Sequence, residues 1–212
     1  RQLFLDQWFK KPVLRQIQPG FYINLDSLVN TPLQDTIQQN QWVGLGPELD
    51  LRHFNGSSDL ESETLFRISK IDGLPAAIML EGQFNPKGDY PGQVILKLNG
   101  IYCQEWHFLL TCSFPAGDNR KVASVLFRYC DGTEYLHPLI YGKDVFAFSD
   151  IRCSRNTRLA WTGKTQSGQL AALNEWVCYL PHSSKRISEL VFQSENTETA
   201  LLVLAVTGVT ES

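Results

Sequence analysis

Short runs of β-branched and aromatic residues dominate the chain from Phe21 onward, and clusters of Gly, Pro, Asn and Asp separate them. Runs of this kind are typical of β-strands, and no segment keeps the 3.6-residue period of an amphipathic helix. The predicted strands cover residues 21–25, 65–69, 76–80, 93–98, 105–114, 121–130, 133–141, 158–162, 169–180, 187–193 and 199–206. So many short strands predict an all-β fold, a two-layer antiparallel β-sandwich.

The same pattern predicts how parts of the sandwich are built. Residues 94–96 form a continuous apolar run and residues 125–129 alternate imperfectly, so some strands should be covered on both faces. Asp131 and Gly132 lie between two extended runs. This dipeptide predicts a tight antiparallel hairpin with a type I′ turn.

Loops and a leader account for the remaining chain. Segments 26–64 and 81–92 are richer in Gly, Pro, Asn and Ser and are predicted to be loops, where binding residues tend to gather. Residues 1–16 mix apolar and basic positions, and Pro12 interrupts any helix there, so this part is predicted to be a leader or linker. One β-sandwich domain is then expected over residues 17–212.

Composition and charge narrow the possible partners. The 212 residues are 43% hydrophobic and 19% charged, which is enough apolar material for one folded core. A net charge of -3 without a dense Lys/Arg stripe argues against nucleic acid. No apolar run approaches the roughly 18 residues that span a bilayer, so no membrane span is predicted within this chain. Because the chain opens at Arg1, we expect it to be part of a longer protein.

Cysteines and histidines show no catalytic or metal-binding spacing. The five cysteines are Cys103, Cys112, Cys130, Cys153 and Cys178, and no pair has CxxC spacing. Apolar, strand-like runs contain Cys103, Cys112, Cys130 and Cys178, which are predicted to be buried thiols, with one disulfide as the alternative. His107 lies in an apolar run and is predicted to be a structural histidine. A thiol dyad of Cys112 with His107 or His137 is the minor alternative.

Carboxylates offer two further possibilities. Glu105, Glu134 and Asp144 could supply the acid and base of a glycoside hydrolase, whose carboxyls must lie close together. Other acidic residues concentrate in the N-terminal loops and could hold one structural calcium ion, although a solvated surface is the main interpretation. They are Asp26, Asp35, Glu48, Asp50, Asp59, Glu61 and Glu63. No catalytic residue and no other cofactor is assigned.

Aromatic residues make up 11% of the chain and suit glycan binding, because sugar rings stack their C–H faces on Trp and Tyr. The pool is Trp42, Trp106, Trp161, Trp176, Tyr90, Tyr102 and Tyr141. Most of these should be core residues. Trp42 and Tyr90 are flanked by loop residues and are predicted to be the exposed members. With Asp50 they form the predicted ligand contacts.

Several motifs together resemble a known type of module. They are Phe21-Tyr22-Ile23-Asn24-Leu25-Asp26, Trp42-Val43-Gly44, Trp106-His107-Phe108, Asp131-Gly132-Thr133, Tyr141-Gly142-Lys143-Asp144 and Trp161-Thr162-Gly163. Over residues 20–208 the chain resembles the galactose-binding-like jelly-roll modules of large bacterial surface or envelope proteins. The resemblance implies a non-catalytic accessory domain that binds carbohydrate, at the cell surface or in the periplasm.

The sequence therefore leaves three candidate functions. The first is glycan recognition by loops at one end of the sandwich. The second is a protein-interaction or spacer domain of a membrane-anchored signalling or envelope protein, with another protein as the partner. The third is a hydrolase, which requires two carboxyls, or Cys112 and a histidine, to converge in one cleft.

Overall fold

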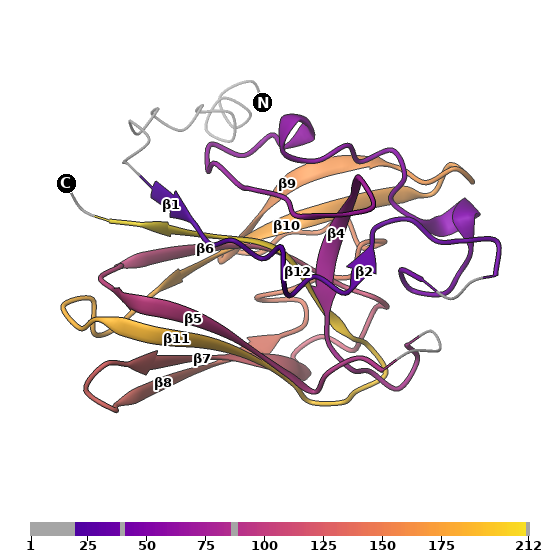
Figure 1. Cartoon of the computed structure of the whole chain (residues 1–212). Coiled ribbons are helices and arrows are strands. Elements are labelled where there is room, and N and C mark those ends of the chain that lie inside the picture. The colour runs from indigo at the N-terminus through magenta and orange to yellow at the C-terminus, as the bar shows by residue number, and fades with distance from the viewer. Residues whose placement is uncertain (1–19, 39–40, 86–88, 211–212) are drawn as a thin grey trace, which may run out of the picture.

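The strands form two antiparallel sheets in the computed structural model, which describes residues 20–38, 41–85 and 89–210 (Figure 1). The larger sheet contains β1 (Gly20–Tyr22), β2 (Thr31–Pro32), β3 (Lys70–Ile71), β4 (Leu74–Met79), β6 (Glu105–Cys112), β9 (Thr157–Lys164), β10 (Leu170–Tyr179) and β12 (Leu201–Val209). The smaller sheet contains β5 (Gln93–Ile101), β7 (Lys121–Tyr129), β8 (Glu134–Ile140) and β11 (Ile187–Ser194). Two short 3-10 helices, η1 (Pro47–Leu49) and η2 (Ser57–Asp59), lie in the N-terminal loops.

The strand order is that of a β-sandwich. The larger sheet runs β2-β4-β12-β6-β10-β9, with β1 beside β12 and β3 beside β4, and the smaller sheet runs β5-β11-β7-β8. From β5 onward the chain passes back and forth between the sheets, as in a jelly roll. The predicted two-layer antiparallel fold is confirmed. Within the described residues, no helix is long and apolar enough to cross a membrane.

The main core lies between the two sheets. Alternate residues of β6, Trp106 and Phe108, point into it, because successive side chains of a strand face opposite sides. The Phe108 ring stacks on Trp176 at a centroid distance of 4.8 Å and meets the edges of Phe127 and Phe192 at 6.4 and 6.0 Å. These contacts join two strands of the larger sheet, β6 and β10, to two of the smaller sheet, β7 and β11, so the sheets share one core.

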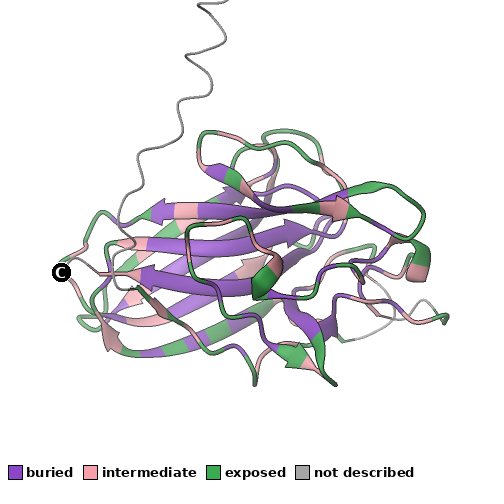
Figure 2. Ribbon diagram, turned by 90° about the horizontal axis from the view of Figure 1, so that it is seen from above, coloured by how far each residue is buried: buried purple, intermediate pink, exposed green. Residues whose placement is uncertain are grey.

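The other face of the larger sheet is also covered. Leu109, on the opposite side of β6, belongs to a second apolar cluster beneath the loop segment 33–68. Trp42 packs on Phe148 and Phe54 on Trp161, with ring centroids 5.5 and 5.4 Å apart. In the view from above, buried positions run along the central strands of this sheet (Figure 2). Coverage on both faces explains why these strands are apolar throughout. Of the two runs that suggested such coverage, residues 125–129 lie in β7, which is buried on both sides over most of its length. Residues 94–96 lie in β5, where Ile95 is 37% exposed, so two-sided coverage there is wrong.

Segment 65–69 does not form the predicted strand. Its side chains do alternate, with Phe66 and Ile68 buried and Leu65 and Arg67 exposed. The Thr207 hydroxyl of β12 donates to the Leu65 carbonyl, so the segment lies over the face of the sheet instead of joining its edge. A two-residue period indicates that one side of a segment is buried, but it does not show that a neighbouring strand is available for pairing.

The β7-β8 hairpin forms where predicted, but the predicted turn type is wrong. Only Gly132 has a positive φ, at 84°, whereas a type I′ turn needs two such residues. The Gly132 amide donates to the Tyr129 carbonyl and the Tyr129 amide to the Thr133 carbonyl. This pattern is a type I turn followed by a glycine bulge. The Asp131 carboxylate accepts from the Thr133 amide and hydroxyl, which favours this turn.

The predicted leader, residues 1–16, lies outside the described residues. The described chain enters the larger sheet at β1, where Gly20 pairs with Val209 of β12.

Candidate functional site

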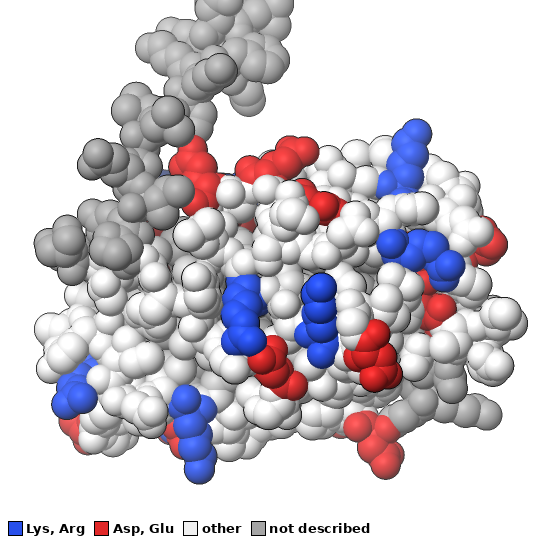
Figure 3. Space-filling view, turned by 45° about the horizontal axis from the view of Figure 1, so that its top comes forward, with Lys and Arg blue, Asp and Glu red and all other residues white. Residues whose placement is uncertain are grey.

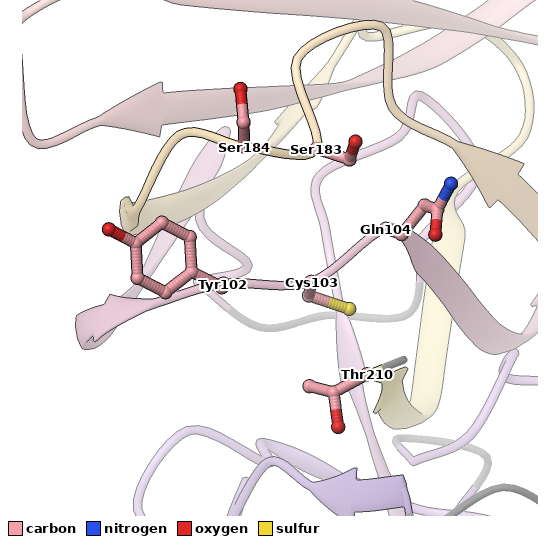
Figure 4. A pocket seen from close by; sticks show the side chains of 6 residues that line it. All are labelled: Tyr102, Cys103, Gln104, Ser183, Ser184 and Thr210. Atoms are coloured by element: carbon pink, nitrogen blue, oxygen red, sulfur yellow. The ribbon is translucent and has the colours of Figure 1, made fainter. Parts of the chain in front are cut away.

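A pocket of about 330 Å³ opens at one end of the sandwich (Figure 4). Three segments form it: the β5-β6 connection, the β10-β11 loop and the residue that follows β12. Its lining residues are Tyr102, Cys103, Gln104, Ser183, Ser184 and Thr210. This volume lies near the lower limit of ligand pockets, about 300 Å³, and suits a small molecule or one unit of a larger ligand.

The lining combines one aromatic ring with neutral polar groups. Tyr102 is 55% exposed, and its ring lies at one side of the pocket with Gln104 at the other (Figure 4). Within the part of the chain that the structure describes, the side chains of Gln104, Ser183 and Ser184 make no hydrogen bond. These amide and hydroxyl groups can each donate and accept. The pocket therefore offers an apolar surface beside unused hydrogen-bonding groups, and none of the lining side chains carries a formal charge.

Two basic residues hold the β10-β11 loop in place. The Arg186 guanidinium lies 5.8 Å from the Tyr102 ring centroid, and its Nε donates to the Gly100 carbonyl at 2.8 Å. On the other side, Lys185 Nζ binds the Asp131 carboxylate at 2.8 Å and the Thr133 hydroxyl at 2.9 Å. The loop is thus tied to the β5-β6 connection and to the β7-β8 turn. This attachment fixes the positions of Ser183 and Ser184 before a ligand binds.

Cys103 is the buried member of the lining, with 2% exposure. Burial raises the pKa of its thiol to about 12, despite contacts from the thiol to the carbonyls of Glu105 and Val209. A thiol with this pKa stays protonated near neutral pH and is a poor nucleophile. Cys103 is therefore part of the pocket wall.

The five cysteines are free thiols in two classes, and we expect them to react accordingly. Cys130 and Cys153 are exposed, so the predicted burial of Cys130, which lies at the β7-β8 turn, is wrong. Burial raises the pKa of Cys103, Cys112 and Cys178 to about 12. Ellman's reagent should titrate the two exposed thiols in the folded protein and all five in denaturant. Fewer than five in denaturant would reveal a disulfide, and more than two in the folded protein would contradict the burial.

A second polar cluster lies on the outer face of the larger sheet and surrounds a buried carboxylate. Glu175 is fully buried, and its two oxygens accept from Ser62 Oγ, Thr64 Oγ1, His107 Nδ1 and both Nε and Nη2 of Arg158, at 2.5–2.7 Å. Burial by itself raises the pKa of the Glu175 carboxyl, but hydrogen bonds from His107, Arg158, Ser62 and Thr64 outweigh it. The resulting pKa is well below the ordinary value.

This cluster attaches the N-terminal loop to the sheet. Ser62 and Thr64 belong to the loop that covers the outer face, whereas His107 and Arg158 project from β6 and β9. His107, predicted to be a structural histidine, is 5% exposed. All acceptor positions of Glu175 are occupied by these donors. We therefore interpret Glu175 as a structural anchor.

The predicted ligand contacts lie elsewhere, in loops over the outer face. Trp42 is fully buried against Phe148, so its predicted exposure is wrong. Asp50 is also fully buried; its carboxylate accepts from the Asp35 amide and from the amide, Nε and Nη2 of Arg52. Their position in predicted loops suggested exposure, but the Trp42 ring packs on Phe148 and the Asp50 carboxylate binds backbone and side-chain groups of its own loop. Neither residue offers a free surface to a ligand.

Tyr90, the third predicted contact, is half-buried and packs against the second apolar cluster. Burial raises the pKa of its hydroxyl. Tyr102 belongs to the aromatic pool, but its sequence context does not mark it as a ligand contact. The available signal was its position in the connection between two predicted strands.

The residues considered for hydrolysis do not share one site. Glu105 contacts His107, Glu134 pairs with Arg128, and the buried Asp144 accepts from Asn156. The Cys112–His107 dyad is wrong, because Cys112 points into the inter-sheet core and His107 to the outer face of the same strand. The alternation of side chains along a strand separates residues an odd number apart.

The acidic loop residues are used largely within the loops. Asp35 accepts from the amides of Thr36, Gln41 and Gly46, and Asp26 pairs with Arg67. Among the described residues, no group of three or more His, Cys, Asp or Glu is arranged to hold a metal ion. Structural calcium stays a prediction.

Charge on the visible face does not form a tract of one sign. Basic and acidic side chains alternate across the view in Figure 3. Such a mixed surface lacks the continuous basic stripe with which proteins follow a phosphate backbone.

Comparison of the chain with protein-family models, curated proteins and solved structures finds no match in any of the three.

Proposed function

We propose that this chain is a non-catalytic carbohydrate-binding module of a larger protein and that the end pocket holds one neutral sugar unit. The observation that carries the proposal is the half-exposed Tyr102 ring beside unused neutral polar groups. A sugar has an apolar C–H face and several hydroxyls around it. The ring matches the first, and the groups of Gln104, Ser183 and Ser184 match the second.

The shape of the pocket supports one unit as the occupant. A volume of about 330 Å³ is small, and its walls are fixed through Lys185 and Arg186. A preorganised wall avoids part of the entropy cost of ordering a loop on binding. The jelly-roll architecture and the resemblance found in the sequence favour the same class of function, although fold alone does not determine a ligand.

An array of neutral mono-, di- and tetrasaccharides of galactose, glucose, mannose and N-acetylglucosamine tests the proposal. We expect the intact domain to bind at least one series. Tyr102→Ala should weaken that binding about tenfold or more, since removing a central aromatic contact typically costs more than 1 kcal/mol.

Phe84→Ala is the matched control, because Phe84 is 62% exposed and lies in the β4-β5 loop at the opposite end of β5. It should bind like the wild-type protein. Failure of every arrayed sugar to bind, or unchanged binding by Tyr102→Ala, would contradict the proposal. An interaction or spacer domain, the alternative, should bind none of these sugars.

A further inference from the structure

A row of four apolar side chains crosses the outer face of the smaller sheet, the face turned away from the larger sheet (Figure 1). In the strand order β5-β11-β7-β8, this apolar row consists of Ile95, Val191, Leu126 and Leu136. Each member pairs directly with the next, so all four lie on one face. Their sequence neighbours Leu96, Phe127 and Phe192 point into the inter-sheet core, which directs the apolar row outward.

Two further rows border the apolar row, one on each side. The polar row consists, in the same strand order, of Gln93, Gln193, Ser124 and Pro138. The charged row consists of Lys97, Glu189, Arg128 and Glu134. Between these borders Val191 and Leu126 are buried, although neither belongs to the two apolar clusters described above. Ile95 and Leu136, on the outer strands, are 37% and 49% exposed, so the accessible apolar surface lies toward the two edges of the face.

The charged row alternates in sign across the sheet. It begins with a positive charge at Lys97 on β5 and ends with a negative charge at Glu134 on β8. In its middle, Arg128 Nη1 lies 2.9 Å from Glu189 Oε2, and Arg128 Nε lies 2.9 Å from Glu134 Oε1. The two end residues, Lys97 and Glu134, are both exposed. The face therefore carries exposed opposite charges at its two edges.

A row with this order of charges is complementary to itself. A two-fold axis parallel to the strands, between β11 and β7, brings a second copy face to face with its strands in reverse order, so that β5 lies opposite β8. Lys97 then faces Glu134 of the second copy, and Glu189 faces Arg128. Ile95 faces Leu136 in the same way. Every charge of the row meets the opposite sign, and the exposed apolar side chains meet each other.

A two-fold axis across the strands does not give this match. An axis along the apolar row would place Lys97 opposite Gln93 of the second copy, and Glu134 opposite Pro138. The charges would then be desolvated against uncharged groups, which is unfavourable. The charge pattern thus favours the axis parallel to the strands.

We propose that the outer face of the smaller sheet binds a second copy of this chain in a symmetric, reversible dimer. Sheets that pack face to face keep their strand directions within about 30° of each other, which this axis allows. Strand spacing and rise give the face roughly 15 Å by 27 Å, about half of the ~800 Å² that each partner buries in a standard interface. A weak dimer is therefore expected. Because the axis runs along the strands, the two end pockets open at the same end of the dimer.

Sedimentation velocity at protein concentrations from about 5 to 500 µM tests the proposal. The wild-type chain should shift from monomer to dimer within this range. Leu136→Glu should weaken the dimer about tenfold or more, because it places a charge against Ile95 of the second copy. Leu170→Glu is the matched control, since Leu170 is also 49% exposed but lies on β10 of the larger sheet. It should dimerise like the wild-type chain.

Charge reversal at the two ends of the charged row tests the axis. Lys97→Glu and Glu134→Lys each bring like charges together at both symmetric contacts and should weaken self-association about tenfold or more. An equimolar mixture of these two variants should form a heterodimer, because opposite charges then face each other at both contacts. Residues 97 and 134 are separated by three strand spacings, about 14 Å, so this rescue does not arise within one chain.

Three outcomes would overturn the proposal. They are a wild-type chain that stays monomeric over the whole range, a mixture of Lys97→Glu and Glu134→Lys that stays monomeric, and loss of the dimer in Leu170→Glu. None of these measurements requires a ligand. The dimer and the sugar pocket can therefore each fail without affecting the test of the other.

Discussion

Replacing Glu175 with Gln should lower the free energy of unfolding by about 3 kcal/mol, because removing one partner of a buried charge network leaves the others unpaired. The amide keeps the shape of the carboxylate but removes its charge and one acceptor oxygen. His107, with a side chain only 7% exposed, then loses its buried anionic partner. Arg158 is 46% exposed and can turn to water, so the effect should lie near the lower end of the range for buried pairs. Urea unfolding measures it.

Glu134→Gln is the control for this substitution. Glu134 pairs with Arg128 on the surface, with side-chain exposures of 51% and 37%. Exposed ion pairs contribute little, so this variant should unfold within about 0.5 kcal/mol of wild type. If the free energy of unfolding of Glu175→Gln also stayed within about 0.5 kcal/mol of wild type, the cluster would not anchor the loop.

The wild-type protein and Glu175→Gln should also differ in how their free energy of unfolding depends on pH. The pKa of the Glu175 carboxyl is lower in the folded protein than its ordinary value of 4.5. Its contribution to stability is therefore fully present above that pH and is lost as pH falls below it, because the unfolded chain binds the proton first. The difference in unfolding free energy between wild type and Glu175→Gln should narrow between about pH 5 and pH 3. A constant difference would contradict the assigned pKa direction.

Most strands were predictable because their signal is local. The runs that became β6, β7, β10 and β12 are long, apolar and bounded by turn residues, and each forms close to its predicted position. The two-residue strand β2 gave no such signal, since Thr31 and Pro32 are too few to show a period. Segment 65–69 has the two-residue period but does not form a strand, because strand pairing depends on residues that are distant in the sequence.

The binding site was less predictable, because exposure is a tertiary property. Trp42 sits among polar loop residues, yet its loop folds back and buries it against Phe148. Tyr102 becomes a pocket residue only when the β10-β11 loop and the end of β12 meet it. No local sequence pattern encodes this contact between segments that are distant in the chain. Glu175 lies in a strand with apolar neighbours, and its partners come from segments 17–113 residues away in the chain.

Phe108 lies in the core that holds both sheets together. Phe108→Ala should destabilise the domain by about 3–5 kcal/mol, the range for removing a buried aromatic ring. Phe108 is fully buried and contacts Trp106, Trp176, Phe127 and Phe192, and so bridges the sheets. Close packing leaves these rings little freedom to fill the space, so a cavity should remain.

The same substitution at Phe84 supplies the comparison, since Phe84 is 62% exposed and touches Phe114 edge-on at 6.2 Å. Phe84→Ala should therefore cost less than about 1 kcal/mol in urea unfolding. If the two variants unfold at similar denaturant concentrations, the contacts of Phe108 across the sheets contribute little to the stability of the domain. If Phe108→Ala alone is strongly destabilised, the inter-sheet core supports the folded domain, and sugar binding at the end pocket should stabilise that folded state by mass action.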